Sequence, residues 1–126
     1  MPCSVAFDPI DKLLIVRFEG SISLPMIASV ASEVARIAAE KDVFFVLTDA
    51  RQAVMDLSTI QIYELPGAIS EVLTAEGSMS HRFRRALVVS ERMKDFDFFE
   101  TVSRNRGHDV MLFRDEEEAR KWLLQK

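Results

Sequence analysis

The chain has 126 residues and a net charge of −4, with 48% apolar and 29% charged residues. This length is typical of a single domain spanning residues 1–126, and the composition is that of a soluble globular protein. The negative charge argues against a general nucleic-acid binder and against adhesion to anionic lipid. Cys3 is the only cysteine, which excludes an intrachain disulfide and a cysteine-based metal cage and fits a reducing cytoplasm.

No apolar run approaches the length of a transmembrane helix. The first residues, Met1 to Ser4, lack the charged region and apolar stretch of a signal peptide. We therefore expect a cytoplasmic protein.

The first part of the sequence predicts a hairpin followed by a helix. Ser4 to Asp8 and Leu13 to Phe18 are strand-like, and the short turn signal between them predicts an antiparallel pair that ends at Gly20. Ser23 can cap the next helix, whose apolar residues recur at steps of three and four until about Asp42.

The stretch from Val43 to Leu47 is entirely apolar, which favours a strand buried on both faces. A strand, a helix and a second strand in this order predict a right-handed parallel crossover. The sequence then becomes polar through Thr48, Asp49 and Arg51, and we expect a loop after Arg51. Because ligands meet the carboxyl ends of strands in open α/β sheets, Asp49 and Arg51 are candidate ligand or partner contacts. The alternatives are that they pair with each other or cap a turn.

The second half continues the alternation of helices and strands. Ser58 and Gln61 match a capping box, and the apolar phase of the helix that follows runs on through Pro66-Gly67. We therefore expect one kinked helix or two short coaxial helices. Four further elements are predicted: a strand from Ala86 to Ser90, a helix from about Asp95 to Arg106, a strand from Asp109 to Phe113, and a final helix capped by Asp115. The fold class is α/β, with five strands in a mixed sheet and about four helices.

Three stretches carry a resemblance to a known fold: Leu13 to Gly20, Leu47 to Arg51, and Val110 to Leu123. The last is the most telling, because it combines a final strand, an acidic cap, Glu-Ala and Trp-Leu. Over nearly its whole length the chain resembles the STAS superfold, and more closely the SpoIIAA-like branch. The resemblance implies a non-enzymatic domain whose relatives are regulatory protein-binding switches. For the SpoIIAA-like branch, a pocket for an apolar ligand and association with membranes have been suggested.

The tripeptide Asp56-Leu57-Ser58 resembles the site of anti-sigma antagonists at which a partner kinase phosphorylates a serine. That serine starts the helix after the central strand, as Ser58 does here. The chain departs from the antagonists at Thr59 to Ile62, where it lacks their acidic residue and glycine. Ser58 is therefore a candidate for phosphorylation or partner contact, and the alternative is that it serves only as an N-cap.

Phe96, Phe98 and Phe99 are the least ordinary feature of the sequence. On a helix, Phe98 and Phe99 share a face that can fill the core, whereas Phe96 lies off it. We expect Phe96 to stay partly reachable and to border a cleft near Leu65 on the kinked helix, open to an apolar chain or a partner's side chain. The alternative is a core that is simply rich in Phe. We also expect Trp122, like Val46 and Val88, to be largely buried.

A basic cluster, Arg82, Arg84 and Arg85, precedes one of the predicted strands. It could bind an acidic partner or a phosphate head group, or form a solvated edge. His81 and His108 alone make a poor metal site. We find no nucleophile with a base, no phosphate-binding glycine motif and no spaced acid pair, and therefore expect no enzyme, cofactor or metal.

Two functions from different classes follow from these features. The first is a regulatory protein-interaction module centred on Ser58. The second is a binder of a small apolar or lipid-like ligand centred on the Phe-rich helix, with peripheral membrane contact. The sequence leaves the partner, the ligand and a homodimer open.

Overall fold

The computed structural model describes residues 3–90 and 94–125, apart from the side chain of Ser80. These residues form β1 (Cys3–Asp8), β2 (Leu13–Ile22), α1 (Leu24–Lys41), β3 (Phe45–Met55), α2 (Thr59–Ala75), the 3-10 turn η1 (Ser80–Arg82), β4 (Arg84–Val88), α3 (Lys94–Asn105), β5 (Asp109–Phe113) and α4 (Glu116–Leu123). The predicted α/β class, with a five-stranded mixed sheet and four α-helices, is confirmed. None of these helices is long and apolar enough to cross a membrane.

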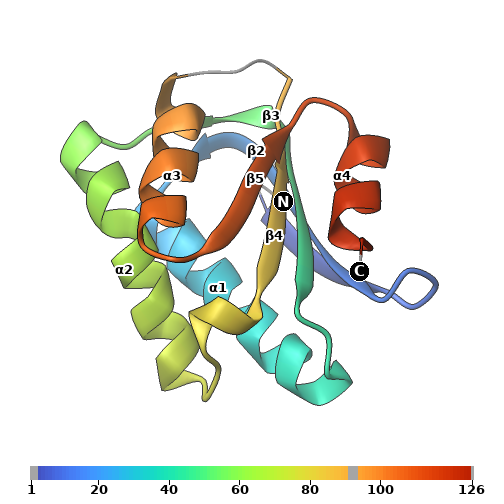
Figure 1. The fold of residues 1–126 in the computed structure, drawn as a ribbon. Coiled ribbons are helices and arrows are strands. Elements are labelled where there is room, and N and C mark those ends of the chain that lie inside the picture. Colours follow the sequence, from blue (N-terminus) through green and yellow to red (C-terminus); the bar gives the residue numbers. More distant parts are fainter. Residues whose placement is uncertain (1–2, 91–93, 126) are drawn as a thin grey trace.

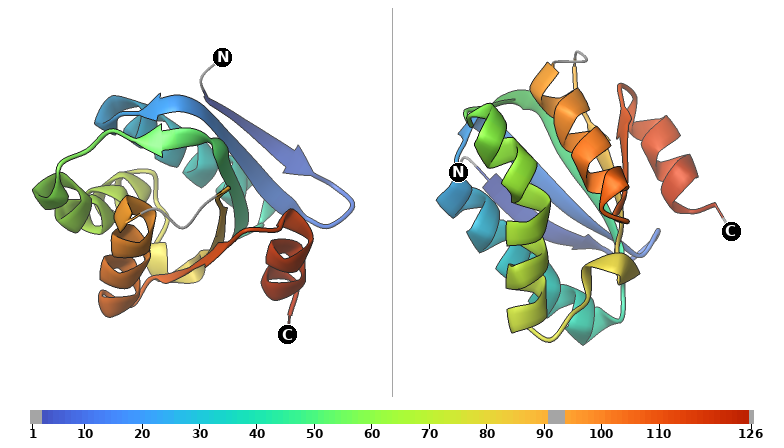
Figure 2. Two further views of the ribbon diagram at one scale, coloured as in Figure 1. Left: turned by 90° about the horizontal axis from the view of Figure 1, so that it is seen from above. Right: turned by 60° about the vertical axis from the view of Figure 1, so that its left-hand side comes forward.

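The sheet has the strand order β1-β2-β3-β4-β5, with β1 antiparallel and the other strands parallel (Figure 1). Successive parallel strands are neighbours, and right-handed crossovers that all step in one direction place their helices on one face. Figure 2 accordingly shows α1, α2 and α3 on one side of the sheet and α4 on the other. We call these the three-helix face and the α4 face.

The helix ends follow the capping residues read from the sequence. Ser23 Oγ accepts a hydrogen bond from the Met26 amide at 3.4 Å, and α1 closes at Asp42, which has a left-handed backbone with φ of 55°. Asp115 caps α4 by accepting from the Glu117 amide at 3.1 Å. Helix α2 runs without a break through Pro66, so the single-helix alternative holds.

Three predicted strands have different ends in the structure. Strand β4 spans Arg84–Val88 instead of Ala86 to Ser90, so Arg84 and Arg85 lie within the strand and not before it. Strand β3 continues to Met55 instead of giving way to a loop after Arg51, and β2 passes through Gly20 to Ile22. The register shifts at this point: Arg17 pairs with Asp49, but Glu19 pairs with Gln52, so β3 holds one extra residue. Asp49 and Arg51 therefore lie inside a strand and not beyond its end.

The two faces differ in the size of their cores. The three-helix face holds the larger core, which includes Val46 at 3% exposure. The core of the α4 face has six fully buried side chains, Leu13, Leu47, Ala86, Val88, Ala119 and Leu123. Val46 and Val88 are buried as predicted. Trp122 is only half-buried, because it lies at the margin of this small core, against Phe113 with ring centroids 5.6 Å apart.

Candidate functional site

The loop between β3 and α2 presents Ser58 at the surface. Ser58 Oγ accepts a hydrogen bond from the Gln61 amide at 3.2 Å, while Gln61 Oε1 accepts from the Ser58 amide at 2.8 Å. This is the predicted capping box, and it leaves the exposed Ser58 side chain at the positive end of a helix. Leu57 turns inward and packs on the larger core. The loop is thus fixed on both sides of Ser58.

Large apolar side chains are exposed in the first turns of this helix. Ile60 is 69% exposed and Tyr63 is 55% exposed. The Arg106 guanidinium lies over the Tyr63 ring, 4.8 Å from its centroid. We call Ser58, Ile60 and Tyr63 the α2-start surface. We did not predict its apolar members, although Ile60 and Tyr63 visibly fall outside the inward phase of α2.

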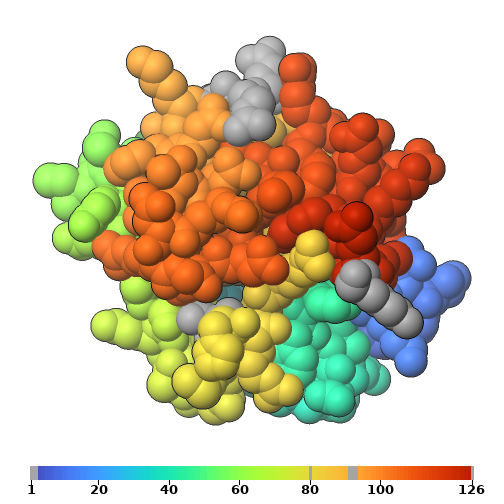
Figure 3. Space-filling model, viewed as in Figure 1, coloured from blue at the N-terminus to red at the C-terminus, as the bar shows by residue number. Residues whose placement is uncertain are grey.

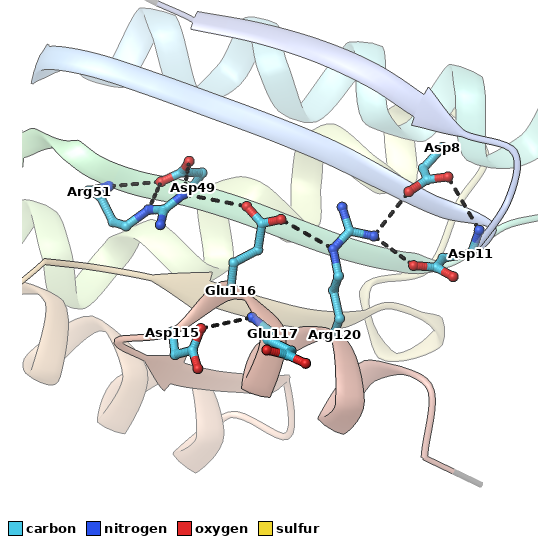
Figure 4. A network of polar contacts seen from close by, with 8 residues as sticks. All are labelled: Asp8, Asp11, Asp49, Arg51, Asp115, Glu116, Glu117 and Arg120. Carbon is cyan, nitrogen blue, oxygen red and sulfur yellow. Dashed lines mark hydrogen bonds and ion pairs between the residues drawn. The ribbon is translucent and has the colours of Figure 1, made fainter.

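Asp49 and Arg51 form part of an ion-pair network on the α4 face (Figure 4). Arg51 donates to both carboxylate oxygens of Asp49, at 3.0 and 2.9 Å, and contacts Glu116 at 3.4 Å. The hydrogen bond from Arg51 holds the pKa of Asp49 below its ordinary value. The alternative that these two residues pair with each other is therefore the arrangement observed. Their role as ligand contacts stays a prediction.

The same network joins the two ends of the chain. Arg120 on α4 contacts Glu116 at 3.3 Å and reaches the β1–β2 turn, where it pairs with Asp8 at 3.0 Å and Asp11 at 2.8 Å. Figure 4 shows this line of charges running from β3 across α4 to the hairpin turn. The network therefore fastens α4 to the hairpin and to β3.

The three arginines of the basic cluster have different surroundings in the fold. The Arg82 guanidinium lies over the Phe44 ring, with its Cζ 4.1 Å from the ring centroid. The Arg84 guanidinium lies over the Trp122 ring, with its Cζ 4.0 Å from the ring centroid. Arg85 turns to the three-helix face and donates to His108 Nδ1 at 3.1 Å. His81 is exposed on η1. In the described ranges, no group of three metal-binding side chains comes together.

An apolar cavity of ≈ 120 Å³ lies between the sheet and α1, α2 and α3. Leu65, Phe96 and Phe99 contribute to its wall, so the predicted closeness of Phe96 to the middle of α2 is confirmed. The predicted accessibility of Phe96 is wrong, because its side chain is only 1% exposed. Phe96 and Phe99 are three residues apart and share the inward face of α3, whereas Phe98 is partly buried at its margin.

A second apolar space of ≈ 160 Å³ lies between α1 and α2. It shares Ile27, Leu65 and Ile69 with the wall of the cavity. These apolar side chains therefore border both spaces.

No protein-family model and no curated protein matches this sequence. Among solved structures, the anti-sigma factor antagonist SpoIIAA in its unphosphorylated form is similar, with a TM-score of 0.58 and 14% sequence identity. The similarity covers 98% of this chain and 99% of that chain. Agreement over both whole chains at so low an identity is agreement in fold. This chain therefore has a SpoIIAA-like fold of the STAS type.

Proposed function

We propose that this chain is a non-enzymatic regulatory module that binds a protein partner through the α2-start surface. The observation that carries the proposal is the exposure of Ile60 and Tyr63 on one side of α2, next to Ser58. Residues three apart on a helix are neighbours, so the two side chains form one apolar area. Apolar groups grouped at the surface are typical of protein interaction sites.

The composition of this surface supports a protein as the bound molecule. Tyr63 has its ring held by Arg106, so it loses little conformational freedom on binding. Tyrosine and arginine are enriched among the residues that contribute most to protein interfaces. The similar structure is that of an anti-sigma factor antagonist, a protein that is itself named for its action on a regulator.

Ser58 gives this surface a means of control. A phosphate on its exposed hydroxyl would lie at the N-terminus of α2, where free amides and the helix dipole favour negative charge. The same charge would stand beside Ile60, in an otherwise apolar contact area. Phosphorylation would therefore leave the helix intact and weaken an apolar partner's binding.

The test is to isolate the tagged chain from its own host and compare three forms: wild type, Ile60→Asp and Ile10→Asp. Ile60→Asp places an acid in the first turn of α2, which the helix dipole tolerates, so folding is preserved. Ile10 is 89% exposed in the β1–β2 turn and serves as the matched control. We expect a stoichiometric partner with wild type and Ile10→Asp and its loss with Ile60→Asp. Equal recovery of the same partner by all three forms would exclude this surface.

The cavity favours a second candidate function, the binding of a small apolar ligand. Apolar cavities of about 150 Å³ stay dry and take up molecules the size of benzene, and this one is only slightly smaller. Ala31 contributes to its wall, so Ala31→Leu should fill the space. We expect an apolar dye to bind saturably to wild type and to Ala119→Leu, and to bind more weakly to Ala31→Leu. Unchanged binding to Ala31→Leu would place the dye elsewhere.

A further inference from the structure

The wall of the cavity is not uniformly apolar. Of the residues that contribute to it, all are hydrophobic except Thr48 on β3 and Arg85 on β4. Val46 pairs with Arg85 and Thr48 pairs with Leu87, so Thr48 and Arg85 come from adjacent strands, diagonally across the ladder. Side chains in this relation point to the same face and are within reach of one long side chain. The two polar groups therefore share one part of the cavity wall.

Among the residues that the structure describes, no carboxylate forms an ion pair with Arg85. The acid that acts on it is Asp109, which is paired with Arg84 at 3.6 Å. Arg85 Nη2 donates to His108 Nδ1, which is a neutral acceptor, and Arg85 Nε is enclosed without a hydrogen-bond partner. An enclosed donor without an acceptor and a partly buried cation without a counter-ion are both unfavourable. An anionic acceptor beside Arg85 would relieve both.

The charge on Arg85 persists under ordinary conditions. Burial lowers the pKa of Arg85 to about 10, so the guanidinium is still protonated at neutral pH. Burial, together with the nearby Arg85, also lowers the pKa of His108, which keeps the imidazole neutral. The pair therefore presents one positive charge, not two.

Arg85 connects the cavity wall with the partly exposed start of β4. The residue is only partly buried, although its Nε is enclosed. Figure 3 shows α3 and the yellow segment that contains η1 on one face of the molecule, with a narrow hollow between them. Arg85 is the second residue of β4 and contributes to the cavity wall. A ligand bound here would keep its polar group beside Arg85 and place its apolar part inside the cavity.

We propose that the cavity binds a compact apolar carboxylate, whose hydrocarbon part fills the cavity and whose carboxylate accepts hydrogen bonds from Arg85 and Thr48. The proposal rests on the second candidate function and names the ligand class for it. A volume of ≈ 120 Å³ suits a single aromatic ring or a short branched chain. A guanidinium is well suited to a carboxylate, because its donors match the two oxygens.

The test uses benzoate and the neutral benzyl alcohol as probes, titrated by NMR against the wild type and Arg85→Gln. Charge-assisted hydrogen bonds to a carboxylate are strong enough that Arg85→Gln should weaken benzoate binding by about tenfold or more. Benzyl alcohol binding should change by less than about twofold, because hydrocarbon burial is unaltered. Arg82→Gln is the matched control: Arg82 stacks on Phe44 outside the cavity, so both probes should bind as in wild type.

Thr48→Val supplies a second variant of nearly unchanged shape, and it should weaken benzoate more than benzyl alcohol. Equal benzoate affinity in wild type and Arg85→Gln, or a wild type that prefers benzyl alcohol, would overturn the carboxylate proposal and leave the apolar-ligand function standing. Failure of both probes to bind wild type would overturn both.

Discussion

On the three-helix face, three helices and the sheet enclose an apolar cavity of ≈ 120 Å³, whereas on the α4 face a single short helix rests on six fully buried side chains. Ion pairs from Arg120 and Arg51 border the α4 face. The three-helix face contains a cavity. The exposed apolar side chains at the start of α2 also belong to this face. The α4 face has a small core of aliphatic side chains, and the ion pairs of Arg51 and Arg120 lie beside it. We propose from this difference that α4 mainly stabilises the fold, while the three-helix face provides the binding surfaces.

The largest expected effect is a difference in unfolding free energy between two aromatic substitutions, one on each face. Phe96→Ala should cost about 3–5 kcal/mol of unfolding free energy, because it removes a fully buried ring beside an existing cavity. Trp122→Ala should cost less, about 2 kcal/mol, because Trp122 is half-buried at the margin of α4. Denaturant melts of both variants measure the difference. A larger loss for Trp122→Ala would mean that α4 contributes more to the core than its burial indicates.

A matched pair of substitutions tests the difference in packing. Ala119 is fully buried beneath α4, so Ala119→Leu should overpack that face and cost about 1–3 kcal/mol. Ala31 borders the cavity, so Ala31→Leu should be neutral or stabilising by about 0.5–1 kcal/mol. Thermal and denaturant unfolding show whether each substitution raises or lowers the free energy of unfolding. Two equal losses would show that the cavity closes around its own side chains in solution.

We expect the N-cap at Ser58 to stabilise the start of α2 whether or not a partner is bound. Ser58→Ala should cost about 1 kcal/mol through loss of the N-cap. Ser58→Asp should cost much less, because aspartate also caps and favours the dipole. Equal destabilisation by Ala and Asp in denaturant melts would contradict the capping role.

The smallest expected effect is the dependence of the α4 face on pH. The pKa of Asp49 is lowered in the folded chain by the hydrogen bond from Arg51. Its stabilising contribution is therefore complete above the ordinary value of 3.8 and is lost as the pH falls through the lower folded-state value. Stability measured between acidic and neutral pH should fall less steeply in Arg51→Gln than in the wild type. Parallel curves would mean that the pair has no net effect.

Local signals in the sequence were sufficient for most of the fold. The caps at Ser23, Ser58 and Asp115 fixed the helix starts, because each satisfies amides within its own first turn. The length of β3 could not be predicted in this way. Asp49 and Arg51 neutralise each other across two residues of one strand, and the extra residue beside them restores the inward direction of Ala53 and Met55. The ion pair and the register shift both depend on how the strands pair in the folded sheet.

The candidate sites depended still more on tertiary structure. The position of Phe96 was misjudged because the helical face was taken from Phe98 and Phe99 together, whereas the buried stripe passes through Phe96 and Phe99. Arg85 looked like one of three equivalent arginines in the sequence. Only the alternation along β4 separates it from Arg84, which turns to the α4 face.

The most direct test of the proposed regulatory function is photocrosslinking in the native host. A photoreactive phenylalanine analogue placed at Tyr63 reports on the α2-start surface, and the same analogue at Ile10 reports on an even more exposed site in the hairpin turn. We predict a discrete crosslinked protein from position 63 and none from position 10, with less product when Ser58 is replaced by aspartate. Crosslinking from position 10 alone, or the same products from both positions, would contradict the assignment of this surface.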